Sequence, residues 1–133
     1  MKVLQFAFSP EERSAYLPHH HKKNSVVYTG THDNETLCGF FLHASDKVKD
    51  FAADYLGCKA ETEPLTWETI RCVFGSVADL AVVQMQDLLL LGDRARMNEP
   101  STVGKNWQWR MNKGMLTPAL SEKLKALCSI YER

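Results

Sequence analysis

The feature of this sequence that most constrains its fold is the alternation of short, continuous apolar runs with segments of helical periodicity. These runs cover residues 3–8, 25–30 and 80–85, and the second of them is rich in β-forming residues rather than wholly apolar. A run that is continuous rather than alternating indicates a strand buried on both faces. Between the second and third runs, apolar residues recur at helical spacing, for example at Leu37 and Phe41. Strands that alternate with helices predict a parallel sheet that is covered on both faces.

Residues with known capping preferences predict where the helices begin and end. Asn34 is a suitable N-cap for the helix that follows the second run, and Gly57 is a suitable stop for the next helix. Thr66 can begin a third helix after a linker at residues 61–65, and Pro118 marks the start of the last helix.

Chain length limits what this alternation can build. A closed barrel of eight strand–helix units needs about 250 residues, whereas the chain has 133 residues. The predicted strands supply roughly three-eighths of such a barrel, so the chain is too short to close one alone. We therefore expect an α/β fold in which residues 1–133 form a single partial domain.

Composition and charge exclude several classes of function. Lysine and arginine together number 16, as do aspartate and glutamate, so the basic excess that is usual in nucleic-acid binders is missing. No apolar stretch approaches the roughly 18 to 20 residues that span a bilayer, and the N-terminal segment does not resemble a signal peptide. The four cysteines form no CxxC pair. We expect no nucleic acid and no membrane as partners, and a cytoplasmic protein with reduced thiols.

A polar cluster, Thr31, His32, Asp33 and Asn34, directly follows the second predicted strand. In α/β proteins the carboxyl ends of strands carry the functional residues. A carboxylate, an imidazole and an amide at one point suit a polyhydroxylated ligand, because each sugar hydroxyl needs a donor and an acceptor. The carboxylate also suits the stabilisation of positive charge on a ring carbon. The alternative is structural: Asp33 or Asn34 caps the next helix and His32 is packed.

A second candidate site lies in residues 92–116, which show no periodicity and are predicted to form one long loop. The residues of interest in it are Asn98, Asn106, Trp107 and Trp109. Aromatic rings stack on sugar faces, and asparagine side chains hydrogen-bond hydroxyls. A loop that is packed by its own tryptophans is an equally good interpretation of these residues alone.

The consecutive histidines at residues 19–21 raise the question of a metal site. Neighbouring residues of an extended segment point to opposite sides, so their rings do not converge on one ion. We interpret them as part of a solvated loop. Trp67, Phe40 and Phe41 lie on helical stripes and are interpreted as core residues.

Both candidate sites resemble segments of one enzyme family. Residues 27–36 resemble the segment around the third catalytic carboxylate of the 4-α-glucanotransferases, which are the amylomaltases or disproportionating enzymes of glycoside hydrolase family 77. Residues 96–102 and 106–110 resemble that family's late loop, and residues 1–8 and 86–88 also fit in order. The resemblance covers nearly the whole chain, but only the C-terminal part of the family's catalytic domain.

This resemblance implies a fold made of about the last three strands, with their helices, of a (β/α)8 barrel. The family transfers segments of α-1,4-glucan between maltooligosaccharides by a retaining double displacement, and it needs no metal or organic cofactor. The resemblance implies that Asp33 is the third catalytic carboxylate. The residues that it places against the substrate are His32, Asn34, Asn98, Asn106, Trp107 and Trp109.

The same resemblance implies that two catalytic groups are missing. The family's nucleophile and acid/base lie on earlier strands, and no segment here matches their motifs. Retaining chemistry needs two carboxyl groups about 5 to 5.5 Å apart, so we expect the isolated chain to be inactive. The implied partner is a maltooligosaccharide or α-1,4-glucan, and exposed barrel edges predict self-association. A non-catalytic carbohydrate-binding or interaction module and a related hydrolase are the alternatives.

Overall fold

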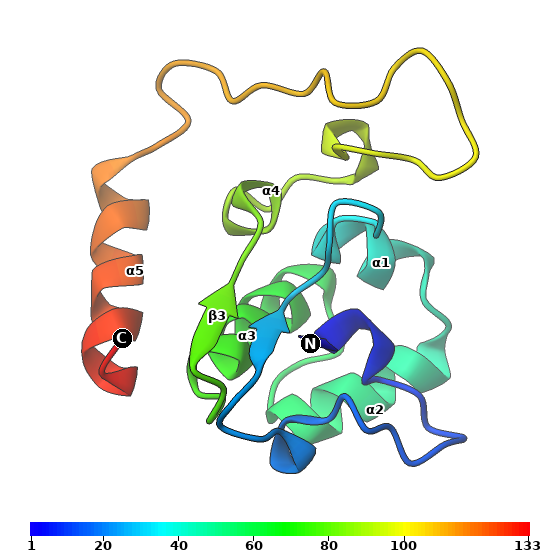
Figure 1. Cartoon of the computed structure of the whole chain (residues 1–133), viewed down its shortest axis with the longest axis vertical. Coiled ribbons are helices and arrows are strands. Elements are labelled where there is room, and N and C mark those ends of the chain that lie inside the picture. Colours follow the sequence, from blue (N-terminus) through cyan, green and yellow to red (C-terminus); the bar gives the residue numbers. More distant parts are fainter.

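The computed structural model describes every residue from 1 to 133. Its strands form one parallel sheet in the order β1, β2 and β3, with β1 at Lys2–Val3, β2 at Val26–Tyr28 and β3 at Leu80–Val82 (Figure 1). Val27 in the central strand pairs with Lys2 on one side and with Ala81 on the other. The order of the strands in the sheet therefore follows their order in the chain.

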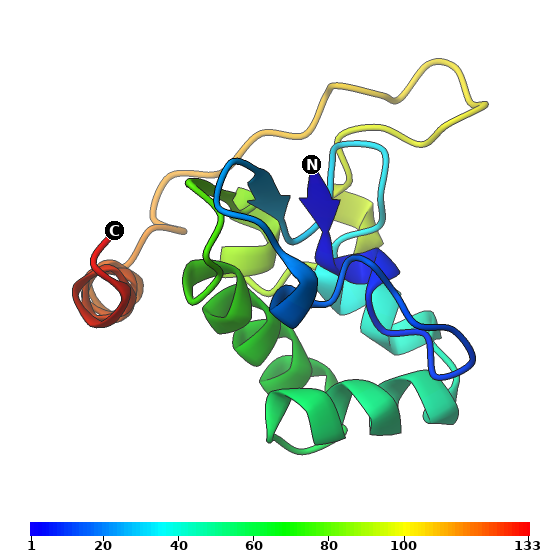
Figure 2. The same ribbon diagram turned by 60° about the horizontal axis from the view of Figure 1, so that its bottom comes forward.

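The helices α1 (Leu37–His43), α2 (Asp46–Leu56) and α3 (Thr62–Phe74) lie together on one side of this sheet (Figure 2). The fully buried apolar side chains between these helices and the sheet include Leu4, Val27, Leu37, Phe41, Leu65, Ile70 and Val73. When right-handed crossovers all advance in the same direction along a sheet, they leave their helices on the same face, as in a barrel.

The strands are shorter than the apolar runs that predicted them. β1 ends at Val3, and the chain continues as a 3₁₀-helix, η1 (Leu4–Phe6). β3 ends at Val82, and a short helix, α4 (Met85–Leu88), follows. Leu4 is nevertheless fully buried in the core. An apolar run reports burial, but it does not distinguish a strand from a turn that is buried beside it.

Of the four predicted helix boundaries, those at Gly57 and Pro118 are confirmed, and those at Asn34 and Thr66 are wrong. Gly57 ends α2 in the left-handed conformation, with φ of 70°, and α5 (Pro118–Tyr131) begins at the expected proline. However, α3 begins at Thr62, so the expected linker at residues 61–65 contains its first turn. Thr66 lies inside this helix, where its hydroxyl donates to the Thr62 carbonyl at 2.7 Å. The N-cap residue of α3 makes no side-chain capping bond, and it therefore gave no signal in the sequence.

The consecutive histidines do not share one environment. The first two are exposed in a short 3₁₀-helix, η2 (Pro18–His20). His21 is buried, with its Nδ1 2.7 Å from the Ser76 hydroxyl and its Nε2 2.7 Å from the Tyr16 carbonyl oxygen. Burial lowers the pKa of His21. The prediction of a solvated loop is therefore wrong for this residue.

The segment between α4 and α5 is irregular apart from a 3₁₀-helix, η3 (Asp93–Ala95), as the missing periodicity predicted. In Figure 1 it runs as a long arm above the strands before it descends into α5.

No helix in the structure is long and apolar enough to cross a membrane. All four cysteines are free. Phe41 is fully buried as expected, whereas Trp67 is only partly buried.

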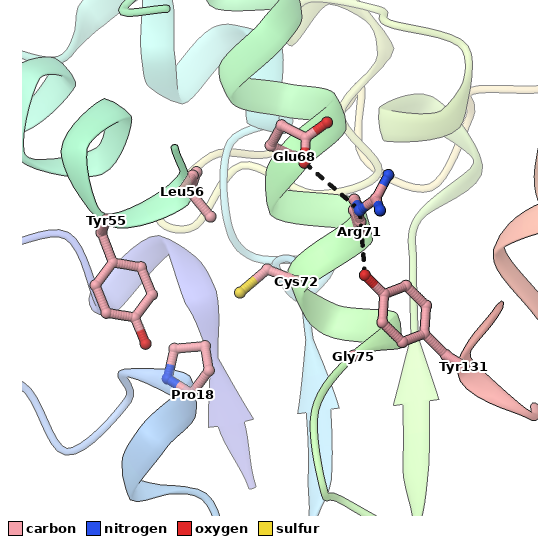
Figure 3. A pocket seen from close by; sticks show the side chains of 8 residues that line it. All are labelled: Pro18, Tyr55, Leu56, Glu68, Arg71, Cys72, Gly75 and Tyr131. Carbon is pink, nitrogen blue, oxygen red and sulfur yellow. Dashed lines mark hydrogen bonds and ion pairs between the residues drawn. The ribbon is translucent and has the colours of Figure 1, made fainter. Parts of the chain in front are cut away.

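A shallow pocket of about 300 Å³ lies among the helices α2, α3 and α5 (Figure 3). On one side, the guanidinium Nε of Arg71 donates to the Tyr131 hydroxyl at 3.1 Å. Cys72 lines the same pocket, and burial raises the pKa of its thiol to about 11. No residue of the two predicted sites lines this pocket, so it does not take part in the site described next.

Candidate functional site

The turn between β2 and α1 presents Asp33 without using it as a helix cap. Thr36 is the N-cap of α1, and its hydroxyl accepts from the Gly39 amide at 3.1 Å. The expectation that Asn34 caps this helix is wrong. The Asn34 side-chain oxygen instead accepts from both the amide and the hydroxyl of Thr31, each at 2.8 Å, and so closes the turn. The carboxylate of Asp33 is therefore available for another role.

Asp33 is the point at which the two predicted sites meet. The side-chain amide of Asn98 donates to Asp33 Oδ1 at 2.6 Å, and His32 Nε2 lies 3.4 Å from the same oxygen. Arg96 donates to the Asp33 carbonyl oxygen at 3.1 Å, while its Nε is buried without a partner. The Asp33 side chain remains 53% exposed, so a ligand can reach it.

Trp107 extends this cluster on the side of His32. The two rings lie 4.9 Å apart between centroids, with an angle of 47° between their planes. Trp107 has a positive φ of 64°, which is uncommon for a bulky residue, and its amide donates to the Met97 carbonyl at 2.6 Å. The indole is half exposed. An exposed carboxylate, imidazole and indole thus lie beside the half-buried Asn98 amide, and this combination suits a sugar.

Asn106 and Trp109 lie outside this surface. The Asn106 side chain accepts from the Glu99 amide at 2.9 Å and donates to the carbonyl and hydroxyl of Thr102, each at 3.1 Å. It therefore braces the loop internally. Trp109 lines a separate pocket of about 430 Å³. The other residues that line this pocket are Leu91, Gly92, Asp93, Arg94, Ala95, Arg110, Asn112 and Met115.

Two glutamine side chains from other parts of the chain hold the turn that carries Asp33. Gln5 donates to the Glu35 carbonyl at 2.7 Å, and Gln84 donates to the Thr31 carbonyl at 3.1 Å. Gly30 makes room for both, since a Cβ there would lie 2.7 Å from the Gln5 side-chain nitrogen. The sequence gave no clear signal for these residues, because isolated glutamines in apolar runs have no diagnostic spacing.

The side chain of Asp87 forms hydrogen bonds with both ends of the same turn. Its Oδ2 accepts from the Thr29 hydroxyl at 2.6 Å, and its Oδ1 accepts from the Leu37 amide at 2.7 Å. The side chain is fully buried. Burial raises the pKa of this carboxyl to about 6, although both hydrogen bonds oppose the shift. Sequence reasoning missed this role, although residues 86–88 belong to the segments that resemble the family.

Asp93 anchors the end of the turn and belongs to the one group of side chains that could share a metal ion. It accepts from the Thr36 amide at 3.1 Å. The Asp93 carboxylate, the Glu35 carboxylate and the His43 imidazole each offer one ligand atom, and these atoms lie within 4.8 Å of one another. His43 Nδ1 lies 2.9 Å from Glu35 and 3.5 Å from Asp93. These contacts inside the group explain its arrangement without an ion.

The known proteins that this chain is similar to belong to one enzyme family. A sequence model of the family described as 4-alpha-glucanotransferase matches residues 1–117. The whole chain is 48% identical to the 4-alpha-glucanotransferase of Streptococcus pneumoniae, of which it covers 26%. It is 42% identical to that of Thermus thermophilus, covering 28%, and 41% identical to the chloroplastic/amyloplastic enzyme of Arabidopsis thaliana, covering 23%.

A solved structure shows the same relationship. The amylomaltase from Streptococcus agalactiae in complex with acarbose is 38% identical, with a TM-score of 0.93 over 100% of this chain and 27% of that one. The chain thus spans about a quarter of the length of the relatives that it matches. Its parallel strands and one-sided helices form part of a (β/α)8 barrel. We conclude that the chain belongs to the 4-alpha-glucanotransferase family and corresponds to the C-terminal part of its members.

Proposed function

We propose that this chain supplies one side of the active site of a 4-α-glucanotransferase, with Asp33 as the carboxylate that stabilises the transition state. The observation that carries the proposal is the 2.6 Å hydrogen bond from Asn98 to Asp33, which joins both predicted sites. An exposed carboxylate held in this way can face the positive charge that develops on the anomeric carbon. His32, beside it, can bind a hydroxyl of the same sugar.

The nucleophile and the acid/base belong, in this proposal, to the part of the family's enzymes that the chain does not span. A retaining double displacement needs two carboxyl groups about 5 to 5.5 Å apart on either side of the scissile bond. The acidic groups near Asp33 do not provide that pair, since Glu35 and Asp93 are engaged with His43. We expect the isolated chain to release no glucose from maltotriose. Glucose release above that of an Asp33→Ala control would contradict this.

The proposed ligand is an α-1,4-glucan or maltooligosaccharide. The support comes from the polar and aromatic surface around Asp33 and from the structural relative, which was solved in complex with acarbose. We propose direct contact of the sugar with His32, Asn98 and Trp107. In the same proposal, Asn34 and Asn106 serve the site through the shape of the turn and loop, and Trp109 is a more distant contact.

Isothermal titration of the chain with maltoheptaose tests this proposal. Asp33→Ala should weaken binding at least several-fold, because it removes a charged acceptor from the surface. Asp50→Ala, at an exposed position of α2, is the matched control and should bind like the unchanged chain. Equal affinity of all three proteins, or no binding at millimolar sugar, would reject a glucan site on this chain.

We also propose that residues 1–133 form one incomplete domain that associates with a second copy of itself. The sheet is open at both edges, because β1 and β3 each have only one neighbour. Leu80 in β3 is 54% exposed and Phe6, after β1, is 52% exposed. Unpaired strand edges beside apolar side chains favour pairing with another chain. Light scattering should show a dimer or a larger species, and a monomer at every concentration would contradict this.

A non-catalytic carbohydrate-binding module is the second candidate function. It is favoured by one observation: the surface that we propose to face the sugar is assembled within this chain, whereas the implied nucleophile is not part of it. The length of the protein in its source, measured by mass spectrometry, separates the two candidates. A cytoplasmic location remains a prediction, and the Arabidopsis relative is named as a chloroplastic/amyloplastic enzyme.

A further inference from the structure

We infer that Asp87 is a positioning residue that holds Asp33 in place by binding both ends of the turn between β2 and α1. The inference rests on the proposed function, because it assigns Asp87 a role in presenting Asp33 to a glucan. Asp87 lies in α4, which follows the carboxyl end of β3. The turn that carries Asp33 follows the carboxyl end of the neighbouring strand β2, at the same edge of the sheet (Figure 1). Its hydrogen bonds go to Thr29 and Leu37, and not to any exposed residue of the site.

The two residues that Asp87 binds define the limits of the turn. Thr29 directly follows β2. Its amide donates to the Val82 carbonyl of β3 at 3.3 Å, and its carbonyl accepts from the Gln5 amide, just after β1, at 3.3 Å. Leu37 is the first residue of α1. The segment between them holds His32 and Asp33. One rigid carboxylate therefore fixes the distance between the point where this segment leaves the sheet and the point where it enters the helix.

Stability alone does not explain a carboxylate at this position. The Asp87 side chain is fully buried, and none of the ion pairs in the structure includes it. Removing an ionised group from water is costly when no cation offsets the loss. An apolar side chain of similar volume would avoid that cost. It could not, however, accept the hydrogen bonds of Thr29 and Leu37.

Variants of Thr29 test the inference with little change of volume. Thr29→Val removes the hydroxyl that donates to Asp87, whereas Thr29→Ser keeps it. Leu127→Ala truncates a buried residue of α5 and serves as a destabilised control that leaves the turn untouched. Three quantities are measured for each protein: the Kd for maltoheptaose, the melting temperature, and the proton NMR resonance of the His32 imidazole, which reports on the turn directly.

We expect Thr29→Val to raise the Kd about ten-fold, as for the loss of one hydrogen bond to a carboxylate, and to shift the His32 resonance. Thr29→Ser should restore both values. Leu127→Ala should lower the melting temperature and change neither. If Thr29→Val does not fold, Thr29→Ala, which also removes the hydroxyl that donates to Asp87, takes its place with the same expectations.

Two results would overturn the inference: an unchanged Kd and His32 resonance in Thr29→Val, or equal changes in Leu127→Ala at a similar loss of melting temperature. A different result separates the inference from the proposed function. If the unchanged chain does not bind maltoheptaose but the His32 resonance shifts in Thr29→Val alone, the positioning role of Asp87 is supported and the glucan site is rejected.

Discussion

The side-chain amide of Asn98 donates to the carboxylate of Asp33 at 2.6 Å, across 65 positions of sequence. The bond connects the turn after β2 with the loop that follows η3. Both this contact and the one from His32 use Oδ1 of the carboxylate. Oδ2 is therefore available to a ligand, while the contacts at Oδ1 orient the carboxylate.

Asn98→Ala should weaken the binding of maltoheptaose several-fold while it changes the stability of the chain little. The lost hydrogen bond is charge-assisted and exposed, so it contributes to the orientation of Asp33 more than to folding. Isothermal titration measures the affinity, and urea unfolding measures the stability. Asn24→Ala, at an exposed position outside the site, is the control. An affinity equal to that of this control would show that Asn98 does not orient Asp33.

Gly39→Ala should destabilise the chain by about 1 to 3 kcal/mol. A Cβ at this position would overlap the carboxylate of Asp93, which would have to leave the Thr36 amide. Gly92→Ala is the matched control, since a Cβ there meets no atom within 4 Å. Urea unfolding of both variants gives the comparison. Equal stability of the two would mean that the approach of Asp93 to α1 is not maintained in solution.

Asp87 should make part of the stability of the chain depend on pH. Burial raises its pKa from 3.8 to about 6, so the folded chain keeps a proton that the unfolded chain has released between these values. The contribution of Asp87 to the free energy of unfolding therefore falls as the pH rises from about 4 to about 6, and is constant above.

Urea unfolding between pH 4 and pH 8, compared with Asp87→Asn, measures this contribution as a difference. His21 acts in the opposite sense, because its lowered pKa makes stability fall as the pH decreases through 6.5, but this effect is common to both proteins. Parallel curves for the unchanged chain and Asp87→Asn would show that the carboxyl titrates normally.

Trp107→Ala should weaken glucan binding more than Trp109→Ala. Trp107 packs against His32 at 4.9 Å, whereas Trp109 lines the separate pocket beside η3. Loss of an aromatic platform from a sugar site costs about 1 kcal/mol or more. Titration with maltoheptaose gives both affinities. A larger effect from Trp109 would move the main contact to that pocket.

Much of the fold followed from local patterns in the sequence. The apolar runs located all the strands, and Gly57 and Pro118 marked helix ends, because a left-handed stop and a proline start are properties of single residues. The placement of the helices on one face did not follow from these local patterns, since it depends on strand order, but the family resemblance implied it through the barrel. The cap of α1 was misassigned because Asn34 and Thr36 are both good caps, and only the tertiary contacts select Thr36.

The exposed residues of the candidate site could be predicted from the sequence, whereas the buried residue that holds their turn could not. His32, Asp33, Asn98 and Trp107 were predicted from polar and aromatic residues after strands, and the structure brings them together. Asp87 was missed because its bonds to Thr29 and Leu37 join segments that are distant in sequence. Periodicity and motif spacing describe single elements, and they carry no information about which buried acid will meet which turn.

The most direct test of the central claim is an NMR titration of the three tryptophan indole protons with acarbose. The chain contains Trp67, Trp107 and Trp109 and no other tryptophan. Trp107 lies at the site, Trp109 lines the neighbouring pocket, and Trp67 lies in α3, so one experiment follows all three places. If Asp33 and its neighbours form a glucan site, the Trp107 signal moves most and the Trp67 signal stays in place. Unchanged signals at millimolar acarbose, or a shift of Trp67 alone, would contradict the account.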